Sequence, residues 1–456
     1  MATFPSTGDP STDWSRFSRP TPEWFLDAKL GIFIHWGAYS LPAWAEPVGE
    51  LGAVDPDEWF AHNPYAEWYW NTIRIEDSPA AHHHRATYGD LDYDAFLDRW
   101  QAEHFDPADW VARFVAAGAR YVVPTSKHHD GIALWEAPGS GARNTVRRGP
   151  RRDLIGAIHD AARAAGMRFG VYYSGGLDWS VADLAPIRSS GDVRGVRPND
   201  AAYATYCALQ VRDLIDRYRP EVLWNDIEWP DSGKHPWAFG LAELFEHYYE
   251  CVPEGLVNDR FGDTHHDYRT SEYQMHRENE AAPVWEHNRG LGFSFGYNQL
   301  EDERHWISLP ELIAHFVDVV SRGGNLLLNV GPMADGTLPA GQRERLDALG
   351  AWNRSEGAAL FGSRPLAEEV ATPGEDPWVR FVRRGDEAWA FTAGGNVVLP
   401  IRHEALRGEI AHLADGTERA LRRVDGGVEV EAPHGTGGLC GISLPLAGGT
   451  GSVPSR

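Results

Sequence analysis

Short apolar runs alternate with helix-length amphipathic stretches between about residues 21 and 357. The apolar runs are often β-branched and nearly continuous, which is typical of strands buried on both faces. They predict seven strands, at residues 31–35, 121–125, 168–174, 221–226, 255–260, 284–286 and 325–330.

Four of the intervening stretches carry clear helix boundaries. These predicted helices span residues 109–117, 153–165, 200–218 and 309–321. Asp106-Pro107 supplies a cap and a first-turn proline before the first helix, and Gly166 ends the second. Strand and helix alternation of this length predicts a parallel α/β barrel.

Polar, reactive side chains stand at the predicted ends of nearly every strand, among them His35, Asp226 and Glu286. In a (β/α)₈ barrel the active site lies at the C-terminal ends of the strands, where residues from several strands converge. A doubly wound open sheet is the alternative, but it often has a glycine-rich first turn. No GxGxxG or Walker sequence is present, so we favour a TIM-type barrel.

The pattern of apolar and polar residues changes after Phe361-Gly362. Short alternating segments follow, broken by Gly-Asp, Gly-Gly and Asp-Gly, which predicts an all-β domain. We therefore expect an N-terminal arm at residues 1–20, a catalytic barrel at 21–357 and a C-terminal β domain at 358–450 that stabilises the barrel.

Composition narrows the function by exclusion. A net charge of -24 argues against a nucleic-acid partner and against an anionic membrane surface. The first 20 residues lack an apolar signal-peptide core, and no run of about 18 apolar residues occurs. Three scattered cysteines form neither a disulfide framework nor a metal-ligand spacing. We therefore expect a cytoplasmic protein without a membrane partner.

Tryptophan is abundant, with 19 residues, and many stand beside His, Asp or Glu. Examples are His35-Trp36, Glu67-Trp68, Trp224-Asn225-Asp226 and Trp285-Glu286. Any single tryptophan is explained well enough as a large core residue. The repeated pairing instead favours a sugar site, in which aromatic faces pack on C–H groups while carboxylates and imidazoles bind hydroxyls.

Asp226 is the leading candidate for a glycosidase nucleophile. It ends the strand Val222-Leu223-Trp224-Asn225-Asp226, and a nucleophilic carboxylate must be held rigidly and kept ionised. A helix-capping role is less well supported, because the following residues do not continue as a helix. Glu228 is expected to lie in the loop.

A retaining or inverting glycosidase also needs a carboxylic acid with a raised pKa. Glu67, Glu272 and Glu286 compete for this role, and each lies next to an aromatic residue that could desolvate it. Sequence spacing alone does not choose among them.

Histidine clusters raise the alternative of a metal site. Adjacent residues of a strand point to opposite faces, so His128-His129 is poorly suited to bind one ion. His82 and His84 have a chelating spacing, but we expect a solvated loop there, and no HExxH sequence occurs. We therefore expect no metal and no cofactor, with His35, His128 and His129 binding hydroxyls as neutral imidazoles.

Several blocks together resemble the α-L-fucosidases of glycoside hydrolase family 29, in order and at similar spacings from about Trp24 to Gly362. The blocks are Phe33-Ile34-His35-Trp36-Gly37, Glu67-Trp68-Tyr69, Lys127-His128-His129-Asp130-Gly131, Tyr172-Tyr173-Ser174, Leu223-Trp224-Asn225-Asp226 and the run from Gly323 to Pro332. The likeness is strongest to the prokaryotic branch. It implies a (β/α)₈-like barrel followed by a C-terminal β-sandwich.

The resemblance also implies roles for individual residues. Asp226 would be the nucleophile, and Glu272, in Asp267-Tyr268-Arg269-Thr270-Ser271-Glu272-Tyr273, would be the acid/base, with Glu286 as the alternative. Other members suggest a catalytic or fucose-binding role for Glu67. The implied fucose pocket comprises His35, Glu67, Trp68, His128, His129, Tyr173, Trp224, Arg260 and Phe295.

The expected activity is retaining exo-α-L-fucosidase action on fucosylated oligosaccharides or glycoconjugates. Three alternatives stay open: an α-L-galactosidase, a metal-dependent hydrolase and a sugar-binding barrel without catalysis. The sequence leaves open which linkage is cleaved and whether the protein is a homo-oligomer.

Overall fold

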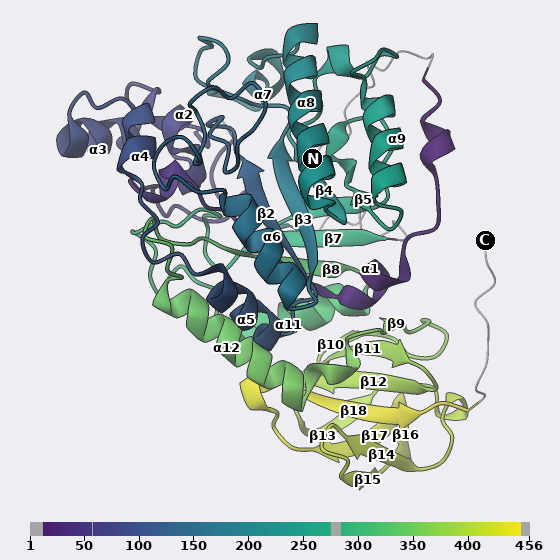
Figure 1. Ribbon diagram of the computed structural model, residues 1–456. Coiled ribbons are helices and arrows are strands. Elements are labelled where there is room, and N and C mark those ends of the chain that lie inside the picture. The colour runs from purple at the N-terminus through teal and green to yellow at the C-terminus, as the bar shows by residue number, and fades with distance from the viewer. Residues whose placement is uncertain (1–11, 57, 275–283, 448–456) are drawn as a thin grey trace.

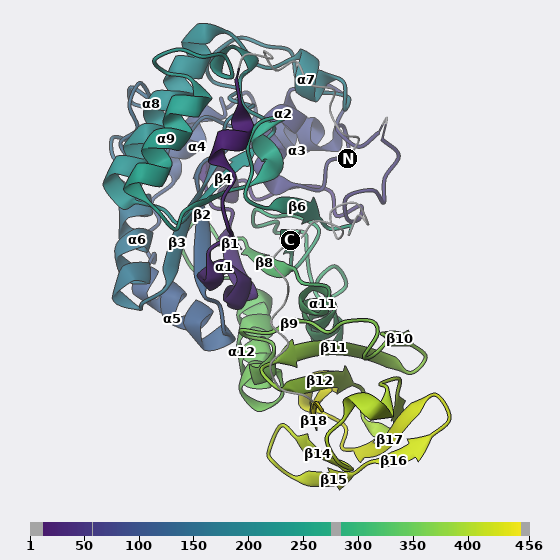
Figure 2. The same ribbon diagram turned by 90° about the vertical axis from the view of Figure 1, so that its right-hand side faces the viewer.

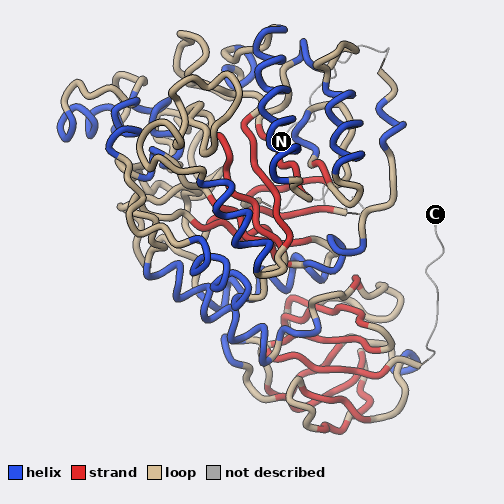
Figure 3. The backbone as a smooth tube through the Cα atoms, in the orientation of Figure 1, coloured by secondary structure: helices blue, strands red, loops and turns tan. Residues whose placement is uncertain are grey.

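The computed structural model describes residues 12–56, 58–274 and 284–447. Its strands fall into two groups, a parallel sheet in the N-terminal part and antiparallel sheets in the C-terminal part (Figure 3). None of the helices in these ranges is long and apolar enough to cross a membrane.

Eight parallel strands form a curled sheet in the order β5-β4-β3-β2-β1-β8-β7-β6. They are β1 (Leu30–Ile34), β2 (Tyr121–Lys127), β3 (Arg168–Ser174), β4 (Val222–Asp226), β5 (Leu256–Val257), β6 (Arg269–Glu272), β7 (Trp285–Gly290) and β8 (Asn325–Val330). The first strand pairs with the last, and a parallel bridge between Asn258 and Tyr268 joins the remaining edges. This arrangement confirms the TIM-type fold.

Helices cover the outer face of the parallel sheet (Figures 1 and 2). α1 (Glu23–Ala28) instead packs Phe25 against Tyr121 and Tyr268 inside the barrel. α2 (Tyr69–Ile73), α3 (Pro79–Tyr88) and α4 (Asp94–Arg99) lie in the connection between β1 and β2, and α7 (Asp192–Gly195) lies in the connection between β3 and β4. The covering helices are α5 (Pro107–Ala117), α6 (Leu154–Ala164), α8 (Ala201–Tyr218), α9 (Leu241–Cys251), α11 (Leu309–Ser321) and α12 (Ala340–Ser355). Their apolar faces bury against the strands in one continuous core. Local signals fix the boundaries: Asp106 caps α5, and Ser308 with Glu311 forms a capping box on α11.

Two strands differ from the sequence prediction because their side chains are polar. β6 has the sequence RTSE and was not predicted, and β7 continues four residues past Glu286 with His, Asn, Arg and Gly, all buried. Polar groups that bond to one another inside a barrel give no hydrophobic signal. Glu286 is therefore the second residue of β7 and not its end. His82 to His84 lie on α3, not in a loop.

The C-terminal region forms two antiparallel sheets around a separate apolar core. The larger sheet contains β9 (Arg364–Pro365), β10 (Gly374–Glu375), β11 (Trp378–Arg384), β12 (Glu387–Thr392), β14 (Ile410–Leu413), β15 (Glu418–Ala420) and β18 (Cys440–Pro445), and the smaller contains β13 (Gly395–Leu399), β16 (Arg422–Val424) and β17 (Gly427–Ala432). Figure 1 shows these sheets beside α11 and α12, at one end of the barrel. The buried Arg380 of β11 forms an ion pair with Asp318 of α11.

Candidate active site

Asp226 and Glu272 are the last residues of β4 and β6, so both lie at the C-terminal edge of the barrel. Arg260 reaches between them from the short helix Asp259–Phe261, which follows β5. Its Nη1 donates to Asp226 Oδ1 at 2.9 Å, and its Nη2 donates to Glu272 Oε2 at 2.9 Å. One guanidinium therefore joins the two carboxylates that the sequence singled out.

Further donors hold the Asp226 carboxylate in place. Tyr172 Oη donates to Oδ2 at 2.8 Å, the Ile227 amide donates to Oδ1 at 2.9 Å, and His129 Nε2 lies 3.8 Å from Oδ2. Burial alone would raise the pKa of Asp226, but Arg260, His129 and the Tyr172 hydrogen bond outweigh it and lower the pKa. The group is thus kept ionised, as a carboxylate nucleophile must be.

The backbone is strained directly after both carboxylates. Ile227 and Glu228 have φ of 59° and 86°, and Tyr273 has φ of 48°. Non-glycine residues rarely adopt this left-handed region, and such strain clusters at functional sites because the surrounding structure must enforce it. The three residues turn the chain sharply at the ends of β4 and β6.

Glu272 lies against an aromatic wall. Tyr65 Oη donates to Glu272 Oε1 at 3.0 Å. The Tyr65 ring lies 6.2 Å from Tyr273 and 5.4 Å from Phe295, measured between centroids. The Glu272 side chain is 16% exposed, so it remains open to a ligand entering the barrel mouth.

The other two candidate glutamates lie in closed surroundings. Glu67 is buried in the short helix Ala66–Trp68, where its Oε2 accepts from the Gly296 amide at 2.8 Å. Glu286 is fully buried within the barrel and accepts from Tyr121 Oη and Trp224 Nε1. Burial raises the pKa of each carboxyl to about 7. Glu286 pairs in register with Asn325, the first residue of β8, so it lies below the strand ends.

Three histidines converge on the barrel mouth. His35 Nδ1 lies 2.7 Å from Asn329 Oδ1, and His129 Nδ1 lies 2.7 Å from Ser174 Oγ. Burial lowers the pKa of His35 to about 3 and that of His129 to about 4, and it lowers the pKa of His128 as well. All three rings are therefore neutral at pH 7. His128 Nδ1 is buried with no hydrogen-bond partner among the described residues, so it is available to a ligand hydroxyl.

Aromatic rings surround these groups. Trp68 lies 5.1 Å from His129 and 5.3 Å from Trp179, and Phe295 lies 5.0 Å from His35. Trp179 Nε1 is a second buried donor without a partner in the part of the chain that the structure describes. Trp224 lies deeper, with the Arg260 guanidinium 4.6 Å from its ring centroid.

The expected role of Tyr173 in this pocket is wrong. Its hydroxyl donates to Gln210 on α8 at 2.9 Å, and its ring packs in the layer between strands and helices. The neighbouring Tyr172 faces the barrel interior and binds Asp226. Adjacent strand residues point to opposite faces, so only one of the two tyrosines could reach the site.

Sequence reasoning missed Tyr65, Tyr172 and Trp179. Trp179 could have been found from the sequence, because it follows Asp178 and so shows the same pairing of tryptophan with an acid as the other candidates. Tyr65 stands two residues before Glu67, but nothing in the sequence links it to Glu272. The contact of Tyr65 with Glu272 and that of Tyr172 with Asp226 both join segments that are far apart in the sequence and meet only in the folded barrel.

Two carboxylates at the ends of β4 and β6, joined by Arg260 and surrounded by neutral histidines and aromatic rings, define a glycosidase. A family model described as Alpha-L-fucosidase matches residues 6–358, so the chain belongs to the α-L-fucosidase family. It is 31% identical over 357 residues to the α-L-fucosidase of Dictyostelium discoideum, covering 76% of this chain and 73% of that protein. It is 34% identical to the tissue α-L-fucosidase of Bos taurus, covering 77% and 72%.

Solved structures agree with this assignment. The crystal structure of Thermotoga maritima α-fucosidase in complex with fucose has a TM-score of 0.84 and 41% identity, covering 95% of this chain and 99% of that one. The same enzyme in complex with a mechanism-based inhibitor has a TM-score of 0.85 at 41% identity. The likeness extends through the C-terminal β sheets.

Proposed function

We propose that the protein is a retaining exo-α-L-fucosidase, with Asp226 as nucleophile and Glu272 as acid/base. The observation that carries the proposal is the Arg260 bridge, because it holds the two carboxylates close together at the strand ends. Retaining glycosidases keep their carboxyl groups about 5–5.5 Å apart, whereas inverting enzymes leave room for a water.

The reaction would proceed in two displacements. Asp226 attacks the anomeric carbon while Glu272 donates a proton to the leaving oxygen, which breaks the glycosidic bond and forms a fucosyl-enzyme ester. Glu272 then takes a proton from water, which attacks the same carbon and releases Asp226. The lowered pKa of Asp226 supports its role as the ionised partner.

The pocket residues would bind fucose by complementary chemistry. Neutral His35, His128 and His129 can donate to and accept from hydroxyls, and the Trp68 ring lies 5.1 Å from His129. Glu67 precedes Trp68 on the same short helix and would bind a fucose hydroxyl. Phe295 and Trp224 would contact the C5 methyl group that distinguishes fucose from galactose. The fucose complex of the Thermotoga maritima enzyme supports this substrate class.

The stereochemical course provides the decisive experiment. Hydrolysis of an aryl α-L-fucoside is followed by proton NMR, and the first-formed anomer is recorded before mutarotation. We expect α-L-fucose. Release of β-L-fucose first would exclude the double displacement, even if the protein hydrolyses the substrate well.

A looser methyl pocket would give α-L-galactosidase activity, which an aryl α-L-galactoside measures in the same assay. The natural substrate is expected to be a fucosylated oligosaccharide or glycoconjugate. We propose that residues 21–357 carry catalysis and that residues 358–450 stabilise the barrel, without a cofactor.

A further inference from the structure

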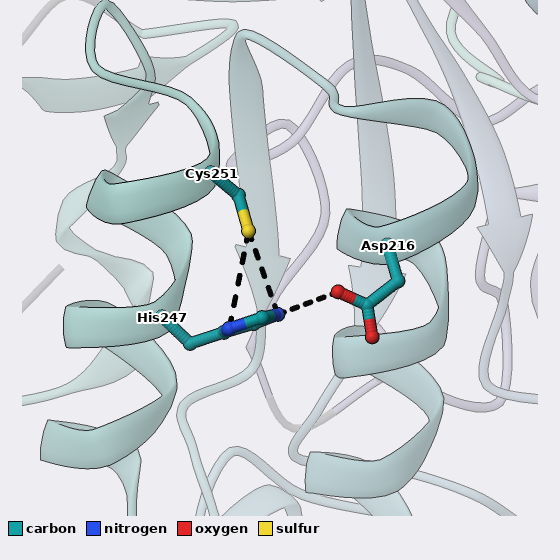
Figure 4. Close-up of side chains that lie close together, drawn as sticks. All are labelled: Asp216, His247 and Cys251. Carbon is teal, nitrogen blue, oxygen red and sulfur yellow. Dashed lines mark hydrogen bonds and ion pairs between the residues drawn. The ribbon is translucent and has the colours of Figure 1, made fainter.

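Three potential metal ligands meet on the outer surface of the barrel, between α8 and α9 (Figure 4). Asp216 lies near the end of α8, while His247 and Cys251 lie on the last turns of α9. The spacing of four residues places the imidazole and the thiol on one helix face. The ligand atoms of all three lie within 4.8 Å of one another.

The three side chains need small movements to enclose a tetrahedral zinc ion. Cys251 Sγ lies 3.7 Å from His247 Nε2, near the separation of about 3.5 Å that zinc bond lengths imply, but it also lies 3.9 Å from Nδ1, so the imidazole must turn to direct Nε2 at the ion. His247 Nε2 lies 2.6 Å from Asp216 Oδ1, a hydrogen bond that would open to about 3.3 Å around the ion. The Asp216 side chain is 51% exposed, so it is free to make this small movement.

The surrounding backbone also favours a cation. Helix α8 ends at Tyr218 and α9 ends at Cys251, so two helix C-termini, each with partial negative charge, face the same place. Arg219 Nη1 donates to the Cys251 carbonyl at 3.0 Å, so its guanidinium offsets part of this negative charge, and the three ligand side chains carry the site.

We propose that Asp216, His247 and Cys251 bind one zinc ion, with water as the fourth ligand. A thiolate with an imidazole selects a borderline or soft metal over magnesium and calcium, which prefer oxygen ligands. The helices end beside the N-terminal ends of the strands, opposite Asp226. The ion would therefore tie α8 to α9 and stabilise the barrel without entering the reaction.

Cobalt(II) provides a direct test, because a cobalt–thiolate bond gives a near-ultraviolet charge-transfer band. The full-length protein is stripped with EDTA and titrated with Co²⁺, and zinc affinity is then measured by displacement. We expect the band in the wild type, its loss in Cys251→Ser and at least tenfold weaker zinc binding in His247→Ala. The matched control is His159→Ala, which removes a partly buried helix histidine that pairs with Asp160 but has no cysteine nearby in the sequence.

Fucosidase activity confirms that each variant is folded, since none of these residues belongs to the active site. Zinc should raise the melting temperature of the wild type and of His159→Ala but not that of His247→Ala. A charge-transfer band that persists in Cys251→Ser, or the same zinc affinity in His247→Ala and wild type, would overturn the proposal. Absence of the band in the wild type would do so as well.

Discussion

Two levels of the barrel interior hold carboxylates among aromatic rings, yet they differ in what surrounds each acid. At the strand ends, Asp226 and Glu272 share Arg260 and remain partly open. One level down, Glu286 is fully buried and bonded to Tyr121 and Trp224. The carboxylates of the upper level are therefore accessible to a ligand, whereas Glu286 of the lower level is enclosed by interior hydrogen bonds.

Neighbouring residues in the sequence would not have separated these levels, because each of the three acids lies within two residues of a tryptophan or tyrosine. Position along the strand does separate them. Catalysis requires access by the substrate and a partner carboxylate within reach, and only the strand-end level offers both. The comparison is tested most directly by removing one acid at a time.

Replacing Asp226 with glycine should have the largest effect. We expect a loss of at least about 10³-fold in kcat, because no other carboxylate can form the covalent intermediate. Azide should restore turnover of an activated aryl fucoside and yield β-L-fucosyl azide, which NMR identifies. Asp226→Gly should stay folded by circular dichroism.

Glu228→Gln is the matched control, because Glu228 is two residues away and pairs with Arg197 and Lys234 outside the site. Activity of this variant within a few-fold of wild type would localise the effect to Asp226. Substantial azide-independent activity in Asp226→Gly would contradict the assignment of the nucleophile.

The next largest effect should come from Glu272→Ala, compared with Glu286→Gln. Loss of a general acid slows poor leaving groups by about 10²–10⁴-fold while sparing activated aryl substrates. We expect this leaving-group dependence in Glu272→Ala alone, measured as kcat/KM over aryl fucosides of graded leaving-group pKa. The same dependence in Glu286→Gln, but not in Glu272→Ala, would transfer the role to Glu286.

Tyr172 and Tyr173 on β3 allow a direct comparison, because the first faces the barrel interior and the second faces the helices. Tyr172→Phe removes a hydrogen bond to Asp226, so we expect kcat/KM to fall by roughly 10- to 100-fold, since a hydrogen bond to a charged group contributes about 1.5–3 kcal/mol. Tyr173→Phe removes a hydroxyl that bonds to Gln210 and Cys207, both on α8, and should leave kcat/KM nearly unchanged. Equal losses in both variants would argue against this separation of roles.

Much of the fold follows from apolar patterning, and the failures have a common cause. Strands such as Asn325–Val330 and helices such as Leu309–Ser321 were predicted within a residue or two because one face or both are apolar. β6 and the end of β7 are polar inside the barrel. Their side chains are buried through hydrogen bonds, so the pattern on which the prediction depended is missing.

The site was predictable only as a set of candidates. Strand-end position indicated Asp226, and the family resemblance indicated Glu272. The choice between Tyr172 and Tyr173 requires the register that pairs Tyr172 with Trp224 and Ser174 with Asp226. The Arg260 bridge requires β4, β5 and β6 to curl together, and no local sequence signal encodes that contact.

The titration of Glu286, the buried acid at the lower level, should make the free energy of unfolding depend on pH. Burial raises the pKa of Glu286 from 4.5 to about 7, so between these values the folded state keeps a proton that the unfolded state loses. The contribution of protonated Glu286 to the free energy of unfolding is fully present below about pH 4.5. It declines as pH rises towards 7, by up to about 3 kcal/mol. Denaturant unfolding from pH 5 to 7 measures it.

Glu286→Gln is the informative variant, because glutamine stays neutral and can still accept from Trp224. We expect its stability relative to wild type to increase between pH 5 and 7. A constant difference across this range would show that Glu286 does not titrate there. Glu67, with a pKa also raised to about 7, remains present in both proteins and cancels in the comparison.

The smallest effect should be on sugar selectivity at the upper level. Phe295 lies 5.0 Å from His35 and 5.4 Å from Tyr65 between ring centroids, so it forms one wall of the open pocket. If this wall contacts the C5 methyl group, the wild type should prefer an aryl α-L-fucoside to the α-L-galactoside by about 1–3 kcal/mol in kcat/KM. Phe295→Ala should reduce this preference several-fold, because the added hydroxymethyl oxygen then gains space. Phe293→Ala should retain it, because Phe293, two residues earlier, makes an edge-to-face contact with His305 instead. An unchanged ratio of kcat/KM for the two substrates in Phe295→Ala would mean that another part of the pocket contacts the methyl group.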